Sequence, residues 1–190
     1  MKGLGMFKGL VAVAMALIVS ASANADSVTF RGQRTDVNLT QEFLGAITSL
    51  GLTPSAVKPG KIIGTQARFP IIAGALDLDN AASEIIHSGG IQLKNDSVTV
   101  QLTNFIIDTT STPVLTGLVK ANGAVVTRLP LFKLALPSLS LPIKRAKRIT
   151  IPDVGVTLTA EAASTLNSVF GVTAFAENFS IGVAHVIIRR

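Results

Sequence analysis

Short segments of this chain alternate apolar and polar residues, a period of two that is typical of β-strands burying one face. On either side of a polar stretch, this alternation predicts a hairpin formed by segments 85–93 and 97–108. A second hairpin is predicted for 114–120 and 124–131. Asn122-Gly123 lies between them and supplies the positive φ angles that a two-residue type I′ turn requires.

Two other segments have the three- and four-residue apolar spacing of amphipathic helices. The first begins after Asn38 or Thr40, both of them good N-capping residues, and ends at Gly51, where a left-handed residue would terminate it. The second lies between Thr159, which caps it, and Gly171, which closes it.

The sequences that lead into these two helices are similar. The pattern V-x-L-T-x-E occurs at 37–42 and again at 156–161. Two interpretations stay open: an internal strand–helix–loop–strand repeat, or the ordinary likeness of any two capped helices. Together the patterns predict a mainly β (α+β) fold, namely a two-layer antiparallel β domain with two short flanking α-helices.

The first 25 residues have the organisation of a secretory signal peptide. Lys2 and Lys8 form a positive n-region, and residues 10–19 are an apolar run too short to span a bilayer core of roughly 30 Å. Ala23-Asn24-Ala25 has the small residues that signal peptidase recognises. We expect cleavage after Ala25, which leaves a single secreted or periplasmic domain, 26–190, with no transmembrane segment.

The residue types missing from the mature chain exclude much chemistry. All three methionines lie in the signal segment, and the chain has no Cys, Trp or Tyr. Disulfides, thiolate nucleophiles and thiolate metal sites are therefore impossible. The chain also lacks a G-x-S-x-G elbow, a phosphate-binding glycine loop and an H-E-x-x-H motif. We expect a protein that is not an enzyme, with no catalytic residues and no metal site.

The chain is basic, with 17 Lys and Arg against 11 Asp and Glu. Much of the excess lies in one cluster, Lys144, Arg145, Lys147 and Arg148. No aromatic residue is interleaved with these cations, so a nucleic-acid partner is not expected. The cluster is interpreted either as a solvated basic loop or as a contact with an anionic surface.

Few other residues are candidates for a site. His87 and His185 are the only histidines. His87 is either a strand-end imidazole bonded to the glycine turn that follows it or a ligand contact together with Ser88, whereas His185 is expected to be an ordinary strand residue. Asp77 and Asp79 are interpreted as turn formers, with a calcium site or paired carboxylates as the alternative.

An unusually apolar run, 129–143, contains Phe132 and Leu134 and three prolines. Because proline cannot donate to a sheet ladder, this run is not expected to form a central strand throughout. It is either an edge strand packed on the core or the lip of a site for a hydrophobic ligand or partner, in which Phe132 and Leu134 contact the ligand.

The order of several motifs resembles that of secreted bacterial proteins with HtaA-type domains: "HSGG" at 87–90, "PLF" at 130–132 and "LTAEAASTLNSVFG" at 158–171. The resemblance covers roughly 68–186. It implies haem binding through a tyrosine axial ligand that a histidine supports. His87 matches the position of that histidine, but the chain has no tyrosine to match the ligand.

The sequence therefore predicts an exported, non-enzymatic binding protein with an HtaA-like domain. Its ligand is expected to be haem or another apolar small molecule, and the cofactor is not identified. The alternative is a surface adhesion or interaction module that contacts a cell-surface macromolecule and takes no small ligand.

Overall fold

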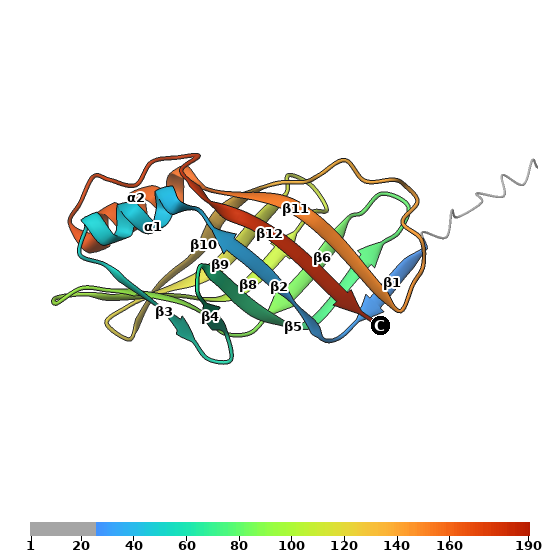
Figure 1. The fold of residues 1–190 in the computed structure, drawn as a ribbon, viewed down its shortest axis with the longest axis horizontal. Helices are drawn as coiled ribbons and strands as arrows, with labels where there is room; N and C mark the ends of the chain where they lie inside the picture. The colour runs from blue at the N-terminus through green and yellow to red at the C-terminus, as the bar shows by residue number, and fades with distance from the viewer. Residues whose placement is uncertain (1–25) are drawn as a thin grey trace, which may run out of the picture.

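The computed structural model describes residues 26–190, so the predicted signal segment and its cleavage site after Ala25 lie outside the described residues. Within 26–190 the structure has twelve β-strands and two α-helices (Figure 1). The strands are β1 (Ser27–Phe30), β2 (Gln33–Leu39), β3 (Thr53–Val57), β4 (Lys61–Ile63), β5 (Gln66–Asp77), β6 (Ser83–His87), β7 (Gly90–Lys94), β8 (Thr99–Asp108), β9 (Val114–Ala121), β10 (Ala124–Ala135), β11 (Arg148–Leu158) and β12 (Ser180–Arg189). The helices are α1 (Gln41–Ser49) and α2 (Ala160–Phe170).

Eight of these strands close into an antiparallel barrel in the order β5-β2-β12-β11-β10-β9-β8-β6, with β6 pairing back onto β5. The prediction of a mainly β fold with two short helices is confirmed, but the prediction of two layers is wrong. The period-two pattern shows that each strand buries one face. It does not show whether the buried faces meet across two layers or around a closed ring.

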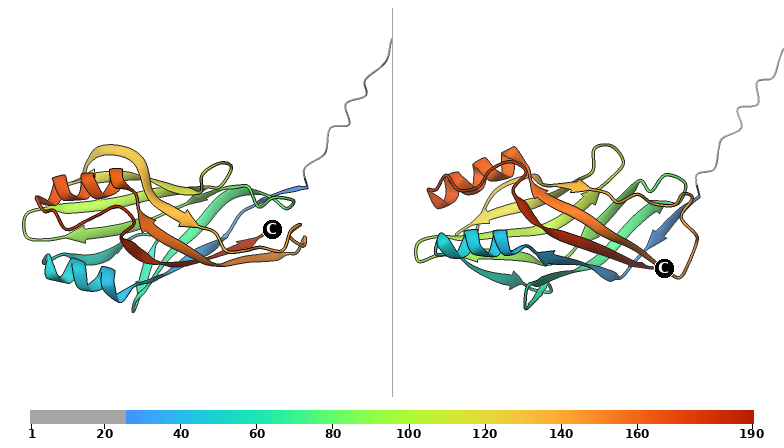
Figure 2. Two further views of the ribbon diagram at one scale, coloured as in Figure 1. Left: turned by 90° about the horizontal axis from the view of Figure 1, so that it is seen from above. Right: turned by 45° about the horizontal axis from the view of Figure 1, so that its top comes forward.

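The remaining strands extend the barrel wall. β1 and β4 pair with β5, while β7 pairs with β8 and carries β3 on its outer side. Both helices lie at one end of the barrel, α1 against β12 and β3 and α2 against β10. The views in Figure 2 show the helices at this end and the C-terminus at the other.

The Asn122-Gly123 hairpin is confirmed. β9 and β10 pair antiparallel, and Asn122 and Gly123 have φ angles of 49° and 85°, both in the left-handed region that the turn requires. The first predicted hairpin forms between β7 and β8 only. Its first segment is broken at Gly89, whose φ is 81°, so β6 and β7 are separate strands that both pair with β8.

Both predicted helix caps are present. Thr40, and not Asn38, caps α1: its hydroxyl accepts from the Phe43 amide (3.1 Å) and donates to the Ser180 carbonyl (3.1 Å). Thr159 caps α2 in the same way. Its hydroxyl accepts from the Ala162 amide (3.0 Å) and donates to the Pro130 carbonyl (2.7 Å). Each threonine therefore joins a helix to a neighbouring strand.

The likeness of the two V-x-L-T-x-E segments covers a strand, its helix and the later strand that pairs antiparallel with the first, β5 with β2 and β12 with β11, but the connection from the helix to the later strand differs. Each segment runs from a barrel strand into a capped helix, β2 into α1 and β11 into α2. After α1 the chain forms β3, which lies outside the barrel ring, whereas after α2 it forms β12 within the ring.

The apolar run 129–143 divides into two parts. Its first part belongs to β10, which has partners on both sides, β9 and β11, so the edge-strand prediction is wrong for this part. Pro130 is tolerated there because a register shift between Pro130 and Phe132 relieves the regular ladder. The second part belongs to the segment 136–147, which connects β10 to β11 without helix or strand.

Candidate functional site

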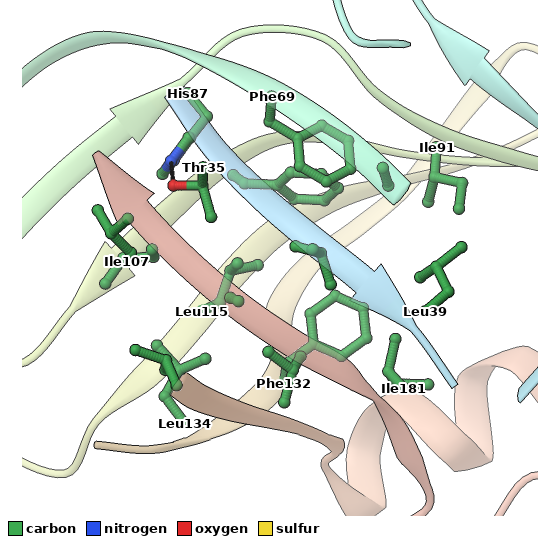
Figure 3. A pocket seen from close by; sticks show the side chains of 17 residues that line it. Thr35, Leu39, Phe69, His87, Ile91, Ile107, Leu115, Phe132, Leu134 and Ile181 are labelled. Carbon is green, nitrogen blue, oxygen red and sulfur yellow. Dashed lines mark hydrogen bonds between the residues drawn. The ribbon is translucent and has the colours of Figure 1, made fainter. Parts of the chain in front are cut away.

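The barrel encloses a cavity of about 60 Å³ to which all eight of its strands contribute inward-facing side chains (Figure 3). Almost all of them are apolar, and several come from segments far apart in the sequence. The lining residues are Thr35, Val37, Leu39, Ala67, Phe69, His87, Ile91, Phe105, Ile107, Leu115, Phe132, Leu134, Val154, Val156, Ile181, Ala184 and Val186.

Thr35 and His87 are the two polar residues of this lining, and they bond to each other. The Thr35 hydroxyl lies 2.8 Å from Nε2 of His87, although the residues are 52 positions apart. His87 is only 2% exposed, and its Nδ1 has no hydrogen-bond partner among residues 26–190. The expected bond between His87 and the glycine turn is therefore replaced by a bond to β2.

Burial sets the protonation state of His87. Removal from water disfavours the imidazolium and lowers the pKa of His87 from 6.5 to about 4. The backbone carbonyls of Phe105 and Ile85 act against this shift but do not offset it. At neutral pH the cavity therefore contains an uncharged imidazole and an uncharged hydroxyl.

The structure brings together three of the four residues predicted to contact a ligand. His87, Phe132 and Leu134 all line the cavity. Ser88 does not: it is half-buried outside the lining, and its amide donates to the carbonyl of Pro70 (3.0 Å). Neighbouring residues of an extended chain point to opposite sides, which separates Ser88 from His87.

Two of the three phenylalanines of the lining, Phe69 and Phe105, and the partner of His87 were not predicted from the sequence. Phe69 and Phe105 pack edge to face with ring centroids 5.1 Å apart. Thr35, Val37 and Leu39 are every second residue of β2, so a period-two pattern is the signal that could have placed them on one face. No pattern in the sequence indicated that this face lies opposite β6.

Two smaller cavities adjoin the first. One, of about 20 Å³, shares Ile107, Leu134, Val154 and Val186 with it and is also lined by Leu136 and Leu139. The other, of about 30 Å³, shares Ile91, Phe132 and Ile181 with it and is also lined by Phe43 of α1 and Leu166 of α2. The three cavities therefore form a row inside the barrel, with Leu134 and Phe132 at the two partitions.

The four residues of the basic cluster are exposed. Lys144, Arg145 and Lys147 lie on the segment 136–147, and Arg148 begins β11 opposite Arg189 of β12. The guanidinium of Arg145 forms an ion pair with Asp26. The cluster thus lies at the end of the barrel that the C-terminus occupies.

The predicted turn formers behave as such. Asp77 accepts a hydrogen bond from the Asp79 amide (2.8 Å) and another from the side chain of Asn80 (2.9 Å). Within 26–190, no group of His, Asp and Glu side chains is arranged to hold a metal ion. His185 is a half-buried residue of β12, whose Nδ1 lies 3.5 Å from the amide of Asp153.

On the outer side of the barrel wall, Asp36 is buried between two arginines. Its carboxylate lies 2.9 Å from Nε of Arg34 and 2.7 Å from Nε of Arg68. Asp36 and Arg34 belong to β2 and Arg68 belongs to β5, so the ion pairs join two neighbouring strands. Arg34 and Asp36 flank Thr35 in β2 and point to the opposite side of the strand. We interpret their ion pairs as holding β2 against β5, which keeps Thr35 in place on the inner face.

None of the helices in the described part of the chain is long and apolar enough to cross a membrane. A scan against protein-family models finds no match, and neither does a search of curated proteins.

Solved structures do match. The C-terminal domain of HtaA from Corynebacterium glutamicum is similar to this chain with a TM-score of 0.66 and 13% identity over 85% of this chain and 98% of that one. The haem-binding protein HtaB from the same organism is similar with a TM-score of 0.59 and 11% identity over 86% of this chain and 95% of that one. At these identities the likeness shows the fold: this chain has an HtaA-like fold.

Proposed function

We propose that this chain is a non-enzymatic binding protein whose barrel interior receives an apolar ligand. The observation that carries the proposal is the cavity beside His87, an apolar space inside a closed barrel that contains one neutral imidazole and one hydroxyl. An apolar ligand there would gain the burial of its own surface, and the imidazole and hydroxyl would orient it.

The paired Thr35 and His87 do not favour catalysis. A general base works best with a pKa near the operating pH, and the pKa of His87, lowered to about 4, makes it a weak base at neutral pH. The cavity lining also contains no carboxylate that could orient the imidazole, which is the role of the third residue in a catalytic triad.

Haem is the second candidate ligand, because the similar solved structure of HtaB is that of a haem-binding protein. The size of the cavity is against a buried porphyrin in the closed barrel. At about 60 Å³ it is smaller than an engineered cavity of roughly 150 Å³ that holds benzene, and ordinary ligand pockets measure about 300–1,000 Å³. Haem would reach His87 only if the barrel wall opened.

If haem binds, His87 replaces the missing tyrosine as the axial ligand, since His87 and His185 are the only conventional strong ligands in the mature chain. An exported location is part of the proposal and follows from the signal-like segment. An adhesion module without a small ligand is the competing class.

Native mass spectrometry of the protein purified from its own exported compartment tests the proposal, together with titration of ferric haem. We expect a co-purified apolar ligand and no Soret shift. A Soret shift that disappears in His87→Ala and persists in His185→Ala would assign haem instead. A bare polypeptide mass without any Soret shift would contradict the proposal and favour the adhesion module.

A further inference from the structure

We propose that the ligand is a single unbranched alkyl chain with a carboxylate head group, its chain inside the barrel and its head at the end that carries the segment 136–147. This inference rests on the proposed function and specifies the chemical class of the ligand.

The shape of the interior points to a narrow ligand without rings. The three cavities lie in a row from the α1 and α2 end, through the space beside His87, to Leu136 and Leu139. None of them has room for a ring system of porphyrin size. Leu134 lines the first and second cavities and Phe132 the first and third, so the proposed ligand requires a change of side-chain rotamer at each of them.

The cavity nearest the basic cluster has an access route. Leu136, which lines it, is 39% exposed, and it belongs to a segment without regular secondary structure. Two backbone hydrogen bonds hold this segment, from the Ile143 amide to the Leu78 carbonyl (2.7 Å) and from the Arg190 amide to the Lys147 carbonyl (3.1 Å). The ion pair of Arg145 with Asp26 and the packing of Leu139 and Ile143 against the core add to them. Because the segment has no strand ladder, it opens at lower cost than a paired barrel strand.

The cations on this segment favour an anionic head group. Lys144, Lys147 and Arg148 are exposed, and none of them forms an ion pair with a residue of the described part of the chain. Arg145, in contrast, is neutralised by Asp26. Three exposed cations within five positions therefore lie on or directly after the segment that covers the access route.

Three carboxylates at the same end already have hydrogen-bond donors. Asp77 accepts from the Asp79 amide, and Asp79 in turn accepts from the Asp26 amide (3.2 Å). Asp108, at the end of β8, accepts from the amide and the hydroxyl of Thr110 (2.9 and 2.7 Å). These acids are held in their own turns, and none of them forms an ion pair with Lys144, Lys147 or Arg148, so these cations can meet the head group of a ligand.

Calorimetric titration with two matched series, saturated fatty acids and primary alcohols of increasing length, tests the inference on the mature protein. We expect about fourfold tighter binding for each added methylene until the row is filled, and constant affinity beyond that length. The acid should bind more tightly than the alcohol of equal length, and this advantage should shrink as salt is added.

Two variants test whether the alkyl chain of the ligand lies inside the barrel. Ala184 lines the first cavity, so Ala184→Leu should fill it and abolish binding. Val183→Leu is the matched control, because Val183 is the preceding residue of the same strand and is 39% exposed on the outside. Leu134→Ala removes a partition and should move the constant-affinity limit to longer chains, which keeps the test decisive if Ala184→Leu does not fold.

The outcomes separate the inference from the proposed function. Equal affinities for acids and alcohols would overturn the head-group assignment and leave the apolar-ligand proposal standing. Unchanged binding in folded Ala184→Leu would place the alkyl chain of the ligand outside the barrel and overturn the inference. A Soret shift in the haem titration with no binding of either series would also overturn it, while absence of any ligand would end both proposals.

Discussion

Acidification should destabilise this protein through His87. The folded state holds the pKa of His87 at about 4, whereas the unfolded chain has the ordinary value of 6.5. Between these values the unfolded state binds a proton that the folded state does not, so the free energy of unfolding falls as the pH falls. At 1.36 kcal/mol per pKa unit, the loss between pH 7 and pH 4 amounts to about 3 kcal/mol.

Urea denaturation at a series of pH values measures this loss. Circular dichroism is the suitable signal, because the chain has no Trp or Tyr. In Thr35→Val/His87→Leu, both partners of the buried bond become apolar and the titrating group is gone. This double variant should lack about 3 kcal/mol of the pH dependence, whereas His185→Leu should retain all of it.

Two results would refute this role of His87. If the wild type and the double variant lose the same free energy of unfolding between pH 7 and pH 4, His87 does not enter the folded state as a neutral buried group. A titration of the His87 imidazole by NMR with a midpoint near 6.5 in the folded protein would refute it as well.

Further predictions concern the caps, two glycines and the N-terminus. Thr40→Ala and Thr159→Ala should each lower the free energy of unfolding by about 0.5–2 kcal/mol in urea denaturation, and unchanged midpoints would contradict the capping role. Gly90→Ala should cost about 3 kcal/mol or more, because its Cβ would lie 2.1 Å from the Leu102 carbonyl oxygen. Gly123→Ala meets no atom within 4 Å and should cost only about 1–2 kcal/mol for its positive φ; equal costs for the two glycines would be inconsistent with the packing. The intact mass of the exported protein should correspond to a chain that begins at Asp26, and retention of the first 25 residues would show that the signal prediction is wrong.

Features that depend on neighbouring residues could be predicted from the sequence. The Asn122-Gly123 turn and the threonine caps of both helices follow from local backbone preferences, and the structure has all of them. Phe132 and Leu134 were predicted to contact a ligand because of their apolar run, and both line the cavity, although they do so from a central strand and not from an edge. The polar character of Ser88 was a misleading signal, since position 87 faces inward and position 88 does not.

What only the tertiary structure decided depends on contacts between distant segments. The sequence determined that the chain forms short amphipathic strands with two capped helices, because these properties are local. Closure of the barrel depends on β6 pairing with both β5 and β8, and the bond between Thr35 and His87 depends on the placement of β2 relative to β6. Strand alternation fixes which face of each strand is buried but not which strand lies opposite, so the cavity and the lowered pKa of His87 emerge only when the ring is closed.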